Sequence, residues 1–220
     1  LAALYPESGG TYVYARHRLG GYFGFIAGWS FVVGKTASLA AMALTFGSYV
    51  SPELARPIGI AAVIALTTVN VLGVEKTVGL TRVIVAVVGV GLAAVVGSSV
   101  FGSSAALPVV TPPPEGVRGI LEAGGLLFFA FAGYARLATL GEEVRDPTTT
   151  IPRAIPAALG IVVTVYALVL AAALSSVGPE VLASSQAPLA DATTAGKWPQ
   201  LTPLVQVAAV VAAAGVLLSL

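Results

Sequence analysis

The sequence predicts an all-α integral membrane protein, and three features support that fold class. Apolar residues make up 57% of the 220 residues, whereas charged residues make up only 10%. The mean hydropathy is +0.94. Soluble domains carry about 25% charged residues, so a lipid bilayer is the solvent that suits this much apolar surface. The apolar residues also form separate runs near the roughly 20 residues that a membrane-spanning helix needs.

The composition also argues against several other classes of protein. The formal net charge of +1 provides no basic surface for a nucleic-acid partner. The chain has no cysteine and one histidine, His17, so disulfides, zinc–thiolate sites and histidine metal clusters are not expected. Phosphate-binding loops, nucleophile elbows and metal-ligand spacings are also missing from the sequence. We therefore expect no enzymatic activity, no cofactor and no metal.

Both ends of the sequence suggest an internal segment of a longer membrane protein. The chain begins at Leu1 rather than at an initiator methionine, and it stops inside an apolar run. The opening LAALYPESGG lacks the charged region that starts a signal peptide. We expect residues 1–4 to be the last turn of a membrane helix.

The apolar runs predict five complete transmembrane helices and two partial ones within a single membrane domain, 1–220. The first complete helix, 22–49, exceeds the minimum length, so it should be tilted. Gly20, Gly24 and Gly28 recur every four residues, a pattern that lets another helix approach closely, and Lys35 falls on the same face. The other helices are expected at 58–74, 83–101, 119–141 (broken near 130–134), 152–177 and, in part, 204–220.

The intervening segments are predicted to be connections. Residues 5–20 form a polar, glycine-rich loop, and residues 178–203 form a long connection of low apolar content. Thr150 is a candidate N-cap for the helix over 152–177, with Pro152 in its first turn, where proline is tolerated.

The distribution of Lys and Arg predicts the orientation in the membrane. Alternating helices place loops 5–20, 75–82 and 142–153 on one side, called side one here, and the remaining loops on side two. Side one carries six Lys or Arg residues and side two carries three: Arg16, Arg18, Lys76, Arg82, Arg145 and Arg153 against Arg56, Arg118 and Lys197. The positive-inside rule then makes side one cytoplasmic in a cell membrane.

The fourth predicted helix contains the strongest candidate for a solute site. Its sequence FAFAGYAR places Gly133 within the span, beside Tyr134 and shortly before Arg136. Glycine permits local unwinding, and unwound backbone at membrane depth is tolerated where it lines a cavity. Phe129, Phe131 and Tyr134 would then provide apolar walls and a lid. The alternative is an intact helix with a packing glycine, since glycine is common in membrane helices.

Three motifs favour the unwound helix that lines a cavity over the intact helix. The segments FFAFAGY and ATLGEEVRDPTTTIPRAI resemble the sixth helix and following loop of the amino acid–polyamine–organocation (APC) permeases. YPESGGTYVYARHRLGGYFGFIAGW resembles the loop between their second and third helices, and NVLGVEKT resembles the end of their fourth. The resemblance implies a partial LeuT-like inverted-repeat transporter fold, from the end of helix two to the start of helix eight.

The resemblance also implies roles for individual residues. Phe129 matches the aromatic gate over the substrate, and Gly133 matches the helix break. Ala130, Phe131 and Ala132 match the unwound backbone that meets the substrate's amino group. The loop signature is matched by Glu142, Glu143, Arg145, Pro147 and Pro152. That signature is either a cytosolic gate held by ion pairs or a solvated loop with helix caps.

The sequence departs from the family pattern at two places. Ala135 stands where relatives usually have an acidic residue, and Arg136 stands where they have a small one. Arg136 would contact a substrate carboxylate, would lock a closed state with an acidic partner, or would extend to the cytosolic interface. Lys35 lies inside a predicted helix, where insertion of a charge costs at least about 2.5–3.5 kcal/mol. It is a candidate for proton coupling, because burial disfavours the charged form, or else a fixed cation paired with a carboxylate.

These observations predict secondary active transport of amino acids or related organic amines by alternating access, driven by protons. The expected partners are the small-molecule substrate, protons and the lipid bilayer. Two alternatives stay open: an exchanger without ion coupling, and a membrane sensor or accessory subunit that binds a solute without moving it.

Overall fold

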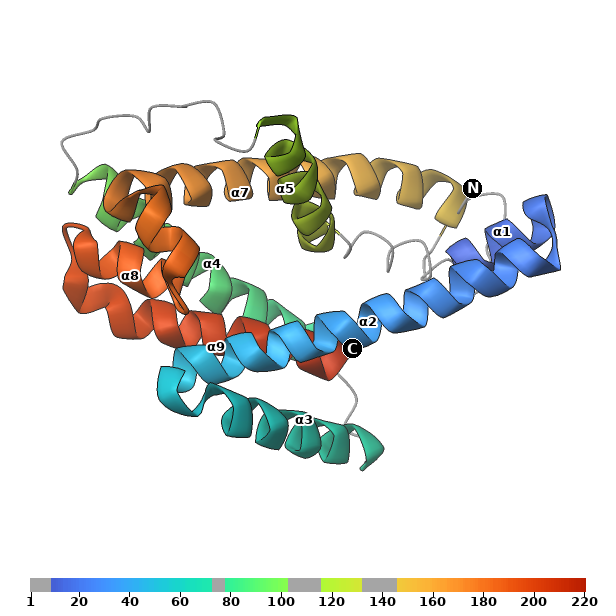
Figure 1. The fold of residues 1–220 in the computed structure, drawn as a ribbon, viewed down its shortest axis with the longest axis horizontal. Coiled ribbons are helices and arrows are strands. Elements are labelled where there is room, and N and C mark those ends of the chain that lie inside the picture. Colours follow the sequence, from blue (N-terminus) through green and yellow to red (C-terminus); the bar gives the residue numbers. More distant parts are fainter. Residues whose placement is uncertain (1–8, 73–77, 103–115, 132–145) are drawn as a thin grey trace. The chain divides into compact units, whose positions relative to one another are not determined.

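The computed structural model describes residues 9–72, 78–102, 116–131 and 146–220, and every regular element in these ranges is a helix (Figure 1). Within these described ranges, five helices are long and apolar enough to cross a membrane: Gly21–Val50, Pro52–Val71, Gly79–Val100, Thr149–Ser184 and Pro199–Ser219. Many large apolar side chains on them are exposed, as lipid-facing surfaces require. The predicted all-α membrane fold class is therefore confirmed.

The chain divides into two compact units. The first comprises Leu1–Thr36 and Val110–Val165, and the second comprises Ala37–Val109 and Tyr166–Leu220. Helices α2 (Gly21–Val50) and α7 (Pro147–Ser184) contribute residues to both units. The two units are considered separately below.

In the first unit, α1 (Thr11–Leu19) lies against the start of α2. The predicted loop over 5–20 was therefore wrong for these residues: glycine pairs flank TYVYARHRL but none interrupts it. Gly20 turns the chain between the helices with a φ of 99°, a conformation that favours glycine. A Cβ at Gly24 would lie 2.9 Å from Arg16 Cβ, and one at Gly28 would lie 3.1 Å from Tyr12 Cδ2. The predicted close approach on the glycine face is thus confirmed for Gly24 and Gly28, with α1 as the partner.

Side chains on α1 support this arrangement. Arg16 Nη1 donates a hydrogen bond to Tyr12 Oη at 3.2 Å, four residues earlier, and Val13 is buried. Burial raises the pKa of the Tyr14 hydroxyl, so this phenol remains uncharged near neutral pH.

Two further helices contribute to the first unit. Helix α5 runs over Gly116–Phe131. Helix α7 begins at Pro147, five residues before the predicted start at 152. The amides of Thr149 and Thr150 donate to the Asp146 carbonyl at 3.1 and 2.9 Å, so Asp146, not Thr150, stands at the cap position. Pro147 takes the first helical position, where its missing N–H costs nothing.

In the second unit, α9 (Thr202–Ser219) packs against α3 (Ala55–Val71), α4 (Val78–Val100) and α8 (Pro188–Ala195). Small residues allow the close contacts. A Cβ on Gly91 of α4 would collide with Ala208 of α9, and one on Gly215 would lie 3.2 Å from Ile84 Cγ2. Helices in lipid gain their association energy from such close packing because water does not drive it.

The predicted connection over 178–203 is also largely helical. Gly178, with φ 79° and ψ 167°, interrupts α7, and helical residues continue to Ser184. Helix α8 follows, and then the short 3-10 helix η2 (Pro199–Leu201). The kink at Gly178 comes directly after residue 177, the predicted end of the span, and the segment predicted to be a connection is itself largely helical. The low apolar content of 178–203 indicated exposure, whereas helix formation depends on local propensity and on packing.

Contacts in the second unit agree with the predicted alternation of the spans. The C-terminal ends of α2, α4 and α7 all meet in one region with α8: Tyr49 contacts Leu189, Ser98 contacts Thr193, and Ser176 contacts Ser99. The C-terminal ends of α3 and α9 meet through Asn70 and Leu218. The three helices predicted to start on side one therefore meet near α8, and the ends of α3 and α9, both predicted to start on side two, also meet.

Asn70 gives a testable measure of one interhelical contact. Its Nδ2 donates to the Leu218 carbonyl at 3.3 Å, so it links α3 to α9. Hydrogen bonds between membrane helices average about 0.6 kcal/mol, and Asn70→Ala should lower the free energy of unfolding in bicelles by about that amount. Thr68→Ala is the matched control, because Thr68 Oγ1 bonds only to Ile64 of its own helix; equal effects of both variants would contradict the link.

Candidate functional site

The structure describes only part of the predicted substrate site. Phe129, Ala130 and Phe131 lie in the last turn of α5 as the structure gives it. Ala130 is exposed and Phe131 is half-buried. Ala132, Gly133, Tyr134 and Arg136 lie outside the described residues, as does the predicted break after them. The described part of the motif thus belongs to an apolar helix, in the last turn of it that the structure describes.

The predicted gate lies between this helix and α7. Glu142, Glu143 and Arg145 are outside the described residues, and Asp146 follows them directly. Asp146 has a φ of 49°, the only positive φ of a non-glycine residue in the described part of the chain. Its carbonyl also accepts the Thr149 hydroxyl at 3.2 Å. The charged motif thus leads into a sharp turn that starts a membrane helix.

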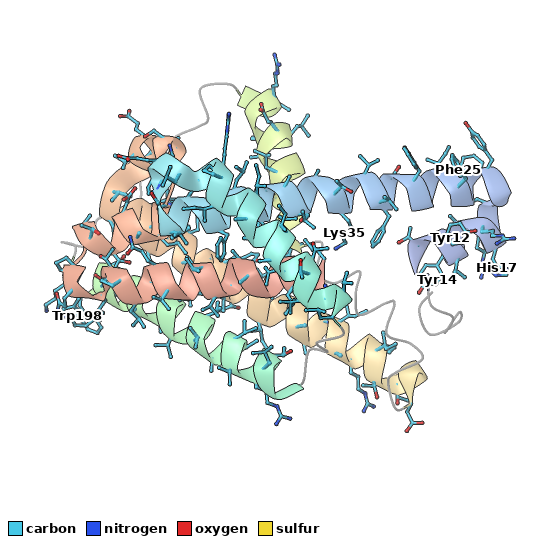
Figure 2. The ribbon with its side chains drawn as sticks, turned by 90° about the horizontal axis from the view of Figure 1, so that it is seen from below. Tyr12, Tyr14, His17, Phe25, Lys35 and Trp198 are labelled. Carbon is cyan, nitrogen blue, oxygen red and sulfur yellow. The ribbon has the colours of Figure 1, made fainter. Side chains whose placement is uncertain are left out.

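Lys35 lies within α2 and is half-buried. Its ammonium stands 5.5 Å from the centre of the Phe31 ring, one helical turn earlier. This distance suits a cation–π contact, which offsets part of the cost of a cation away from water. Figure 2 shows the position of Lys35 along α2. The contact with Phe31 is local to one helix, so it is compatible with either role considered for this residue.

A buried hydroxyl cluster, formed by Ser98, Ser99, Ser176 and Thr193, joins α4, α7 and α8 in the second unit. Ser98 and Thr193 are 0% exposed and Ser99 is 1% exposed. The Ser98 hydroxyl donates to the Thr193 carbonyl at 3.3 Å and accepts the Trp198 amide at 3.1 Å. Ser176 Oγ lies 2.7 Å from Ser99 Oγ. In a region of low polarity each such group is costly unless it is paired, so the cluster fixes how the three helices meet.

Backbone contacts also hold the end of α4 close to the segment that follows α8. The Lys197 amide donates to the Ser98 carbonyl at 2.9 Å. A Cβ at Gly196 would collide with Ser98 Oγ, so glycine is required for the approach. The rings of Phe101 and Trp198 pack with centroids 5.6 Å apart. At the other end of α8, the Leu189 amide donates to Tyr49 Oη at 3.2 Å. Helix α8 is therefore held at both ends.

The sequence-based interpretation missed this cluster, although a signal was present. Ser98-Ser99 and Ser175-Ser176 stand at the ends of two apolar spans that both finish on side two. Hydroxyl pairs at matching depth in neighbouring helices are candidates for interhelical hydrogen bonds. Within the described residues no group of three or more His, Asp or Glu side chains is placed to hold a metal ion.

Comparison with known proteins gives consistent results along the whole chain. The sequence profile of the family described as "Amino acid permease" matches residues 1–220. An uncharacterized transporter of Mycobacterium tuberculosis is 58% identical over 222 residues, which cover 100% of this chain and 50% of the relative. A serine/threonine exchanger of Bacillus subtilis is 29% identical over 73% of this chain and 38% of the relative.

A more distant relative, the chloroplastic cationic amino acid transporter 7 of Arabidopsis thaliana, is 26% identical over 93% of this chain and 40% of its own length. The chain spans at most about half the length of these curated relatives. The match over all 220 residues, together with the membrane helices, shows that the chain belongs to the amino acid permease family of the APC superfamily.

Proposed function

We propose that the protein containing this chain is a secondary transporter that moves an amino acid or a related organic amine across the cell membrane by alternating access. The observation that carries the proposal is the family match over residues 1–220, and the five membrane-length helices support it. Side one, which holds the predicted loops 5–20, 75–82 and 142–153, faces the cytoplasm in this proposal.

In the proposed site, the substrate ammonium meets the backbone carbonyls of Ala130 and Phe131, in the last described turn of α5, and of Ala132. Phe129 and Tyr134 cover the substrate, and Arg136 meets its carboxylate. The backbone opens at Gly133. Glu142, Glu143 and Arg145 form the cytosolic gate in this proposal. They directly precede the turn at Asp146 in the sequence. An amino acid carries an ammonium group and a carboxylate group. An unwound helix suits such a substrate because its backbone groups offer an opposite partial charge to each of these two groups.

Lys35 is the proposed coupling residue for protons. Lys35→Gln keeps a polar side chain but removes the amino group, so uptake should lose its dependence on external pH while the protein remains folded. Uptake of a labelled substrate into proteoliposomes between pH 5.5 and 8 measures this. Arg118→Gln is the control, because Arg118 is an exposed cation at the start of α5. A pH profile that Lys35→Gln leaves unchanged would show that Lys35 is a fixed cation.

Exchange without ion coupling is the second candidate, and the name of the Bacillus subtilis relative, a serine/threonine exchanger, favours it. The two mechanisms differ in whether substrate must be present inside the vesicle. A proton symporter accumulates labelled amino acid in empty proteoliposomes when an inward proton gradient is imposed, whereas an exchanger needs internal substrate. A panel of labelled amino acids, with and without that gradient, decides between them.

A further inference from the structure

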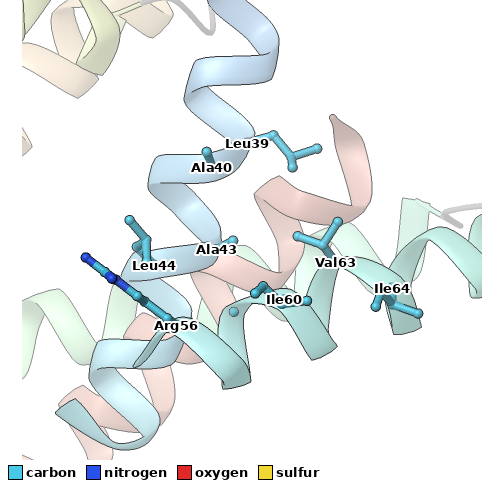
Figure 3. A pocket seen from close by; sticks show the side chains of 9 residues that line it. Leu39, Ala40, Ala43, Leu44, Arg56, Ile60, Val63 and Ile64 are labelled. Carbon is cyan, nitrogen blue, oxygen red and sulfur yellow. The ribbon is translucent and has the colours of Figure 1, made fainter. Parts of the chain in front are cut away.

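An apolar groove of about 420 Å³ lies between α2 and α3 in the second unit. Figure 3 shows the side chains that line it on the two helices. The helices touch along its floor, because a Cβ at Gly59 would lie 2.6 Å from the Ala43 carbonyl oxygen. The lining residues are Leu39, Ala40, Ala43, Leu44, Arg56, Gly59, Ile60, Val63 and Ile64.

The length of the groove along α3 is close to that of one lipid acyl chain in a bilayer. Arg56 stands in the first turn of α3, close to the connection with α2, and Ile64 lies two turns further along. From Arg56 to Ile64 the helix rises about 12 Å, at roughly 1.5 Å per residue. One leaflet of the hydrocarbon core is about 15 Å thick. With the first turn of α3 at the membrane interface, a groove of this length would extend through most of one leaflet.

The walls of the groove are open rather than covered by described residues. Ile60 and Ile64 are 62% and 63% exposed, and Leu44 is 47% exposed. Such contiguous apolar surface is stable when hydrocarbon fills it. An acyl chain supplies that hydrocarbon without introducing polar groups.

Arg56 distinguishes this groove from an ordinary apolar face. It is exposed and is the only charged side chain that lines the groove among the described residues. Figure 3 shows it beside Leu44 at one end. A packed protein helix would have to supply a carboxylate to pair with this guanidinium, whereas an anionic phospholipid supplies a phosphate whose negative charge no other group of its headgroup compensates, next to its acyl chains. Guanidinium groups bind phosphate oxygens through two parallel hydrogen bonds.

We infer that the groove between α2 and α3 binds one anionic phospholipid, with an acyl chain along Ile60 and Ile64 and the phosphate group on Arg56. A helix from elsewhere in the whole protein, or a second copy of it, is the competing occupant.

Mass spectrometry of the intact whole protein tests the site. The protein is released from micelles that contain equal amounts of phosphatidylglycerol and phosphatidylcholine with identical acyl chains, and retained lipids are counted. Arg56→Gln should lower phosphatidylglycerol retention about fivefold, the effect expected of one cation at a lipid surface, and should leave phosphatidylcholine unchanged. Ala40→Phe fills the groove from an exposed position, so it should lower retention of both lipids. Arg118→Gln, an exposed arginine outside the groove, is the matched control and should change neither.

Each other outcome overturns the inference. Equal loss of both lipids in Arg56→Gln would show that the headgroup is not recognised. If neither Arg56→Gln nor Ala40→Phe changes retention while both variants elute as the parent protein does, no lipid occupies the groove and protein covers it. If Arg118→Gln lowers phosphatidylglycerol retention as much as Arg56→Gln does, the loss reflects the net charge of the protein and not a site at Arg56.

Discussion

Replacing Gly133 by valine is expected to weaken substrate binding by about tenfold to hundredfold and to remove most uptake. A branched side chain restricts the backbone and adds volume where the substrate is proposed to lie. Overpacking of a fitted site costs about 1–3 kcal/mol, and every 1.4 kcal/mol is about tenfold in affinity. Binding of a labelled amino acid to the purified whole protein measures the loss directly.

Gly160→Val is the matched control for this prediction. Gly160 lies within α7, is exposed, and has no atom within 4 Å of an added Cβ. The same substitution there should leave binding near the parent value. If Gly133→Val binds substrate as tightly as Gly160→Val does, then Gly133 is a packing glycine in an intact helix and the proposed break is wrong.

Replacing Ser98 by alanine should lower the free energy of unfolding by about 1–3 kcal/mol, the cost of leaving one buried polar group unpaired. The Thr193 carbonyl keeps a second donor, the Gly196 amide at 3.1 Å. The Trp198 amide, in contrast, loses the Ser98 hydroxyl that accepts it. Helix α8 would then be held less firmly to α4. Chemical unfolding of the whole protein in micelles measures the change.

Ser175→Ala supplies the comparison for Ser98. The Ser175 hydroxyl bonds only to the Ala172 carbonyl in its own helix, at 2.9 Å, and alanine favours a helix slightly more than serine does. Its removal should leave stability unchanged or slightly higher. A loss for Ser175→Ala as large as that for Ser98→Ala would mean that hydroxyl content, rather than the link between helices, sets the stability.

Much of the fold could be predicted because the bilayer simplifies the sequence pattern. A span must be long, apolar and helical, so length and hydropathy locate it without knowledge of tertiary contacts. The spacing of Gly24 and Gly28 indicated a close contact, and α1 makes it. The interruption at Gly178 falls where the predicted span over 152–177 ends.

The errors lie in the connections, where the bilayer imposes no such rule. Residues 11–19 and 188–195 are polar enough to leave the membrane, yet they form α1 and α8 because they pack against spans. The start of α7 was missed because Asp146 adopts a positive φ, which charge and hydropathy do not show. For the candidate site, the glycine within an apolar span pointed to the residues around Gly133, and the family motifs then favoured a helix break there over an intact helix. The buried hydroxyl cluster was missed because it depends on which helix ends meet, and that is known only from the three-dimensional structure.

Counterflow in proteoliposomes tests most directly the claim that the whole protein is a carrier. Vesicles are loaded with an unlabelled amino acid and diluted into a trace of the same labelled compound, with no ion gradient. A carrier with an alternating site draws label inward transiently, whether protons or exchange drive it, and we expect this overshoot for at least one amino acid or amine. Saturable binding of that compound without any overshoot would contradict transport and would identify the protein as a solute-binding sensor.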